Sequence, residues 1–287
     1  MSEKRKIKKF IILTGGRTGS TAIVKWLNSS PLIRCHNEVF LAYHNTSIDS
    51  FGYYVSNVRK SPTLYKYGFH WRFAGIEKNP ISVPYTNAFM NDLFYSSEFT
   101  KPWEKLSDKE TYIKNENFDT EKLVGYKIGY TQYDALYGAR KWIRDNNVYI
   151  LQLFRKNLLK KHISKMMADK TSVWHSQDKV NNTKLNLDIK HALERIKITE
   201  EKDIAVTREL NSYQKKVLPI YYEDFVADKA AFSEKLATFF EEDAAIFNNL
   251  VTSLKKLNPN KLPDLLENYE EVYNSFSKTE YRKFLHD

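Results

Sequence analysis

The chain opens with a short apolar run, a turn that contains three glycines, and a helical pattern of apolar side chains. The run covers residues 10–14 and is typical of a buried strand. The turn follows at 15–19, and apolar side chains over 22–27 then recur at helical spacing. Residues 32–35 indicate a second short strand. The opening therefore predicts a strand–turn–helix–strand unit, as parallel sheets use.

The rest of the chain continues this alternation. Strands are predicted at 123–130, 148–154 and 217–221, and helices at 135–145, 157–169, 189–216 and 229–240. The alternation predicts an α/β fold: a single domain over 1–287, with helices flanking a mostly parallel central sheet. Residues 40–120 fit neither period, and we expect them to be an aromatic-rich insertion that covers a site.

Composition narrows the class of protein. Hydrophobic residues make up 42% of the 287, which suffices for a packed core, and the one cysteine, Cys35, excludes an intrachain disulfide framework. No apolar run approaches the roughly 18 residues of a membrane span, and no signal-peptide segment is evident. We therefore expect a cytoplasmic protein. The cysteine and the seven histidines show no zinc-ligand spacing, so we expect no metal.

The net charge of +10 indicates an anionic partner. The turn after the first predicted strand is a candidate site for one, because amides at a helix N-terminus and the helix dipole attract anions. Ser20 and Thr21 add hydroxyl donors there, and Arg17 adds a forked cation. A tight turn with a hydroxyl cap is the alternative. The turn lacks the Gly-Lys-Ser/Thr ending of a nucleotide triphosphatase loop and the dinucleotide fingerprint, which disfavours a kinase or GTPase.

A second basic position follows the clearest predicted strand. Arg155 leaves that strand at its carboxyl end, where ligands gather in open α/β sheets, and Ser164 lies nine residues on in the next predicted helix. If this helix packs beside the sheet, both side chains converge on a second phosphate. The alternative is a surface pair between Arg155 and a carboxylate, with Ser164 as an ordinary helical serine.

Together these segments resemble the sulfotransferases that use 3′-phosphoadenosine 5′-phosphosulfate, and they are similar to the bacterial carbohydrate branch of the trehalose and nodulation-factor kind. The resemblance covers 10–38, 123–175 and 217–257, about half of the chain. Its motifs are Gly-Arg-Thr-Gly-Ser-Thr at 16–21, Asn-Glu at 37–38, Leu-Phe-Arg-Lys-Asn at 153–157 and Tyr-Tyr-Glu-Asp-Phe at 221–225. Arg17 stands where the wider superfamily commonly has lysine, and arginine is usual in the bacterial branch.

The resemblance implies transfer of a sulfuryl group from this donor to a hydroxyl of a carbohydrate or glycolipid, with adenosine 3′,5′-bisphosphate as the product and no metal. It implies that the insertion covers the acceptor. The implied donor-binding residues are Gly16, Arg17, Thr18, Gly19, Ser20, Thr21, Arg155, Ser164, Lys255 and Lys256. The last two belong to a late basic segment, for which a solvated helix end is the alternative.

Sulfuryl transfer also needs a base for the proton of the acceptor hydroxyl, and Arg17 is expected to offset charge on the leaving phosphate. The resemblance points to Glu38 as the base, and a surface carboxylate paired with Arg34 or Arg17 is the alternative. His36 is the rival, because an unperturbed imidazole titrates near neutral pH and in an extended segment it faces the same side as Glu38. His70 is a further candidate.

A competing hypothesis is a non-catalytic protein that binds a nucleotide or nucleic acid through the same basic loop. The basic residues are spread along the chain rather than gathered in one tail, which disfavours a nucleic-acid arm. The oligomeric state stays open.

Overall fold

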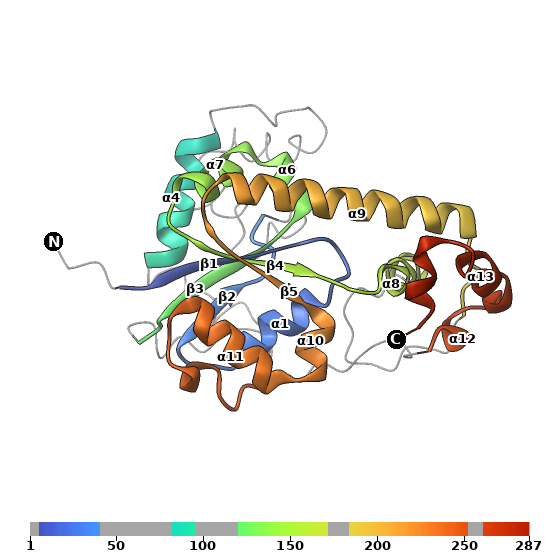
Figure 1. The fold of residues 1–287 in the computed structure, drawn as a ribbon. Coiled ribbons are helices and arrows are strands. Elements are labelled where there is room, and N and C mark those ends of the chain that lie inside the picture. The colour runs from blue at the N-terminus through green and yellow to red at the C-terminus, as the bar shows by residue number, and fades with distance from the viewer. Residues whose placement is uncertain (1–5, 41–81, 96–119, 172–183, 252–260, 287) are drawn as a thin grey trace.

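One parallel sheet organises the protein. The computed structural model describes residues 6–40, 82–95, 120–171, 184–251 and 261–286. Within them, the strands are β1 (Lys8–Thr14), β2 (Ile33–His36), β3 (Leu123–Gly129), β4 (Tyr149–Phe154) and β5 (Lys216–Tyr221). The strand order is β2-β3-β1-β4-β5, and every neighbouring pair is parallel (Figure 1). The predicted α/β fold with a mostly parallel sheet is confirmed.

Helices flank this sheet. The α-helices are α1 (Ser20–Leu27), α4 (Ser82–Tyr95), α6 (Tyr130–Ala135), α7 (Tyr137–Asp145), α8 (Leu158–Thr171), α9 (Ile189–Ser212), α10 (Tyr222–Ala227), α11 (Lys229–Phe240), α12 (Leu262–Leu265) and α13 (Tyr269–Phe276). Two 3-10 helices are η5 (Ala244–Phe247) and η6 (Glu280–Leu285). None of the helices in the described ranges combines the length and apolar character needed to cross a membrane.

Two predicted helices differ from the structure. The helix predicted at 135–145 is two helices, because Leu136 has a φ of −114° and a ψ of 87°, which no helix accommodates. The helix predicted at 189–216 ends at Ser212, since Gln214 adopts a left-handed φ of 52° and β5 begins two residues later. Of the insertion predicted at 40–120, the structure describes one long element, α4.

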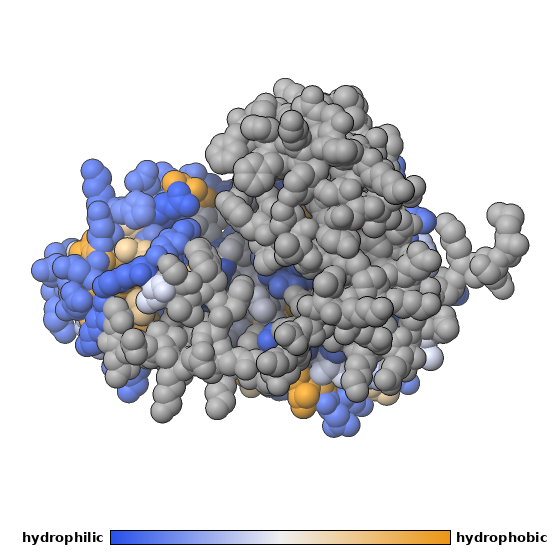
Figure 2. Space-filling model, turned by 180° about the vertical axis from the view of Figure 1, so that it is seen from behind, coloured by the Kyte–Doolittle hydropathy of each residue, from blue (hydrophilic) through white to orange (hydrophobic). Residues whose placement is uncertain are grey.

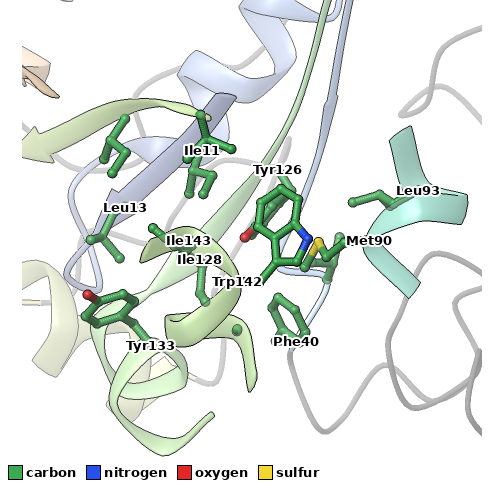
Figure 3. Close-up of a cluster of buried hydrophobic side chains, with 14 of the residues drawn as sticks. Ile11, Leu13, Phe40, Met90, Leu93, Tyr126, Ile128, Tyr133, Trp142 and Ile143 are labelled. Atoms are coloured by element: carbon green, nitrogen blue, oxygen red, sulfur yellow. The ribbon is translucent and has the colours of Figure 1, made fainter. Parts of the chain in front are cut away.

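The strands β1, β3 and β4 are largely buried on both sides because helices cover both faces of the sheet. Ile11 and Leu13 of β1 face the layer of α4, α6, α7 and α9, where Tyr126 and Trp142 join them (Figure 3). Phe10 and the alternate residues of β1 face α1, α10, α11 and η5. Figure 1 shows these two layers on opposite sides of the sheet.

A third apolar cluster lies beyond the carboxyl ends of the strands. It joins α8, the first half of α9, α12, α13 and η6. The long helix α9 belongs to two clusters, since Ala192 and Ile196 pack here while Val206 and Leu210 pack over the sheet. Figure 2 shows mostly hydrophilic residues at the end of the molecule that these C-terminal helices form. The carboxyl edge of the sheet therefore lies between the sheet layers and this third cluster.

Candidate functional site

The loop between β1 and α1 is fixed to the sheet by two threonines. Thr14 donates a hydrogen bond to the Leu153 carbonyl of β4 at 2.9 Å, and its hydroxyl lies 2.6 Å from the hydroxyl of Thr18. Both threonines are buried. Thr18 therefore serves the loop itself, rather than presenting its hydroxyl to solvent as a donor for a ligand.

Two positions of the loop have left-handed backbone, Arg17 with a φ of 61° and Gly19 with a φ of 79°. Glycine adopts such angles without strain. A Cβ at Gly19 would also lie 2.2 Å from a ring carbon of Tyr222, the first residue of α10. Gly19 thus allows both the turn and the close approach of α10 to the loop.

Arg17 reaches across to the helix that follows β4. Its Nε and Nη2 donate to Ser164 Oγ at 3.2 Å and 3.1 Å. Burial lowers the pKa of Arg17, and the charge of Arg155 lowers it further, although an arginine stays protonated at such a site. The structure thus brings together Arg17 and Ser164, which the sequence assigns to separate phosphate subsites.

Arg155 also contacts this loop. Its Nη1 donates to the Arg17 carbonyl at 3.4 Å, and its guanidinium lies over the Tyr222 ring at 5.7 Å. Its Nε lies 3.8 Å from Oε1 of Glu223, and the other carboxylate oxygen of Glu223 accepts a hydrogen bond from the Lys156 amide at 2.9 Å. The contact with a surface carboxylate, expected as the alternative, is therefore present: the Glu223 side chain is 33% exposed, whereas that of Arg155 is only 13% exposed.

Glu38 follows β2 at the same edge of the sheet. Its carboxylate pairs with Lys127 Nζ at 2.8 Å, rather than with Arg34 or Arg17. Arg34 instead pairs with Glu121 at 3.0 Å. Lys127 is buried in β3, and burial lowers its pKa while Glu38 raises it. The ion pair fixes the carboxylate of Glu38, whose side chain remains 29% exposed.

The expectation that His36 and Glu38 face the same side is wrong. β2 ends at His36, and Glu38 has a left-handed φ of 44°, so the segment is not extended there. His36 is buried opposite Tyr126 of β3, whereas Glu38 pairs with the next residue, Lys127, which points to the other face of the sheet.

The order of the strands sets the spacing of these groups. Glu38 follows β2, the loop follows β1, and Arg155 follows β4. Neighbouring strands lie about 4.8 Å apart, so the ends of β2 and β1 are separated by roughly 10 Å, with β3 between them. Arg155 is one strand from the loop on the other side. The edge thus carries a carboxylate at one end, and at the other end two arginines beside the turn that the sequence predicts to bind an anion.

Sequence reasoning missed two groups of this site. Lys127 is a charged residue inside the apolar run of β3, and that interruption is the signal that identifies it. Lys161, in the first turn of α8, is buried beside the loop and carries no such signal, because it lies in a run of polar helical residues.

Lys255, Lys256 and His70 lie outside the described residues. In the described ranges no three His, Cys, Asp or Glu side chains are grouped so that they hold a metal ion.

Comparisons with known proteins find similarity only among solved structures. No protein-family model matches the chain, and no curated protein matches it. Among solved structures, the chain is similar to the sulfotransferase from Alicyclobacillus acidocaldarius, with 11% sequence identity and a TM-score of 0.43 over 98% of this chain and 96% of that one. An identity this low assigns no activity and no site residue to the chain.

Proposed function

We propose that the protein is a sulfotransferase that moves a sulfuryl group from 3′-phosphoadenosine 5′-phosphosulfate to a hydroxyl of a carbohydrate or glycolipid. The observation that carries the proposal is the convergence of Arg17, Ser164 and Arg155 around the loop after β1. This donor has two anionic ends, a 5′-phosphosulfate and a 3′-phosphate. Two arginines from different elements beside one helix N-terminus suit such a ligand. The donor and the acceptor class rest on the motif resemblance.

The proposed reaction needs positioning and charge stabilisation more than covalent chemistry. The acceptor oxygen forms a bond to sulfur while the bond between sulfur and the bridging oxygen breaks. The electron pair of that bond leaves with the 5′-phosphate of adenosine 3′,5′-bisphosphate, and the hydroxyl proton passes to the carboxylate of Glu38. Arg17 offsets the charge that grows on the leaving phosphate. The acceptor hydroxyl would lie over the carboxyl end of β3, between Glu38 after β2 and the loop after β1.

The residue Arg155 provides a test of the donor site. In the wild type, the 3′-phosphate is expected to make adenosine 3′,5′-bisphosphate bind more tightly than adenosine 5′-monophosphate. Arg155→Ala is expected to weaken binding of the bisphosphate by about 1.5–3 kcal/mol, the scale of a charge-assisted hydrogen bond, and to affect the monophosphate much less. Calorimetric titration of both ligands into both proteins measures the two differences.

Lys156→Ala is the matched control, because this neighbouring side chain is 53% exposed and pairs with Asp224 away from the loop. It should leave both affinities close to those of the wild type. If Arg155→Ala lost the same amount of affinity for both ligands, Arg155 would support the loop and bind no 3′-phosphate. Unfolding temperatures of all three proteins are recorded, since Arg155 is largely buried.

A further inference from the structure

Lys161 lies against the first glycine of the loop. It is buried, with 9% of the residue exposed. Its Nζ is 2.9 Å from the point that a Cβ on Gly15 would occupy, and its Cε is 3.6 Å from the same point. The Tyr130 ring lies 3.7 Å from that point. The absence of a side chain at Gly15 therefore leaves the space in which the ammonium group of Lys161 lies.

The ammonium group of Lys161 has a countercharge nearby but no acceptor in contact. Burial lowers the pKa of Lys161, Asp203 of α9 raises it, and Arg155 lowers it. Across the described ranges, Lys161 Nζ makes no hydrogen bond and no ion pair within contact distance. A buried charge is costly unless it is paired and hydrogen-bonded. The three donors of this ammonium group are thus available beside an anion-binding turn.

Asp203 is held so that it balances this charge from a distance. Burial raises the pKa of Asp203, while the charge of Lys161 and the nearby Tyr130 hydroxyl lower it. Tyr130 in turn accepts a hydrogen bond from Gln152 of β4 at 3.3 Å, and Gln152 also donates to Thr207 of α9 at 2.9 Å. This network fixes α9 over β4. It therefore holds the part of α9 that carries Asp203 near Lys161.

We propose that Lys161 is a further ligand for the anion that the loop binds. This inference rests on the function proposed above, in which that anion is the phosphosulfate end of the donor. Lys161 of α8 donates hydrogen bonds to this anion, while Arg17 and the amides at the start of α1 bind it from the loop. Asp203 is a positioning residue, whose negative charge attracts the ammonium group of Lys161.

Lys161→Met tests this inference, because methionine fills the same space without charge. The probes are adenosine 3′,5′-bisphosphate, inorganic pyrophosphate and adenosine 3′-monophosphate, titrated by calorimetry. We expect the variant to bind the bisphosphate and pyrophosphate about 10- to 100-fold more weakly and the 3′-monophosphate as the wild type does. The unfolding temperature of the unliganded variant is recorded alongside, since removal of the ammonium group leaves Asp203 without this countercharge.

Lys165→Met is the matched control, one turn along the same helix, with a side chain that is 52% exposed and paired with Asp169. It makes the same change of charge and should leave all three affinities unchanged. Lys161→Gln is a second variant in case Lys161→Met does not fold. It should show the same selective loss of affinity for the bisphosphate and pyrophosphate.

Three results would overturn the inference. Unchanged binding of the bisphosphate and pyrophosphate by Lys161→Met, with a lower unfolding temperature, would make Lys161 structural. If the variant lost as much affinity for the 3′-monophosphate as for the bisphosphate, Lys161 would bind the 3′-phosphate instead. A wild type that binds none of the probes would contradict both proposals. A wild type that binds pyrophosphate but not the bisphosphate would overturn the proposed donor alone, and the pyrophosphate titrations would then decide the role of Lys161.

Discussion

Replacing Glu38 by glutamine is expected to lower sulfuryl-transfer turnover by about 10²–10⁴-fold, the contribution of a general base, and to leave the affinity for adenosine 3′,5′-bisphosphate unchanged. Glutamine keeps the shape of the side chain and an oxygen that accepts a hydrogen bond from Lys127, which lies 2.8 Å from the carboxylate. It removes only the ability to take the proton of the acceptor. Because the carboxylate lies about two strand spacings from the loop, binding of the bisphosphate should not depend on it.

The turnover is measured with radiolabelled donor after a screen of sugars and glycolipids for an acceptor. Glu241→Gln is the control, because this carboxylate also pairs with a lysine, Lys216, at the amino end of β5. Lys127 is buried and loses its countercharge in Glu38→Gln, so rates are compared per folded protein with unfolding temperatures alongside. Near-normal turnover in Glu38→Gln, together with loss of turnover in His36→Ala, would assign the base to histidine.

Glu121→Ala is expected to cost about 3–5 kcal/mol of the free energy of unfolding, the largest effect on stability that we predict. Glu121 precedes β3 and pairs with Arg34 of β2 at 3.0 Å, and both side chains are only 2% exposed. Removing the carboxylate leaves the buried guanidinium without this countercharge. Urea unfolding of the variant and the wild type measures the difference.

A surface carboxylate supplies the comparison. Asp145 contacts Lys141 and Arg144 at the end of α7, and its side chain is 40% exposed. Asp145→Ala should cost less than about 1 kcal/mol, because water screens exposed pairs. If Glu121→Ala costs no more than Asp145→Ala, the buried pair does not stabilise the link between β2 and β3.

The sheet was predictable because the strands β1, β3 and β4 are largely buried on both faces, so short and mostly apolar runs mark them. The glycine turn after β1 was predictable for the same local reason, since few other sequences allow the backbone of Gly19. The break in the helix predicted at 135–145 was not, because the non-helical conformation of Leu136 has no glycine or proline to mark it.

The site was predictable only where local sequence determines it. The position of Glu38 depends on its left-handed backbone and on Lys127, a partner from a strand far along the chain. The burial of Lys161 depends on how α8 packs beside the loop and α9, so the polar sequence around this lysine resembles an exposed helix. Contacts between elements distant in the sequence decide both residues, and no pattern of spacing encodes such contacts.

The binding of the donor by the loop and Arg155 is tested most directly by thermal unfolding of the wild type with adenosine 3′,5′-bisphosphate, ATP, GTP or NAD at equal concentration. A ligand that binds only the folded protein stabilises it by about 2.7 kcal/mol at 100 times its dissociation constant. We predict that the bisphosphate raises the unfolding temperature and that ATP, which lacks a 3′-phosphate, does not. Equal or larger stabilisation by ATP would contradict the assignment of this edge of the sheet to a sulfuryl donor.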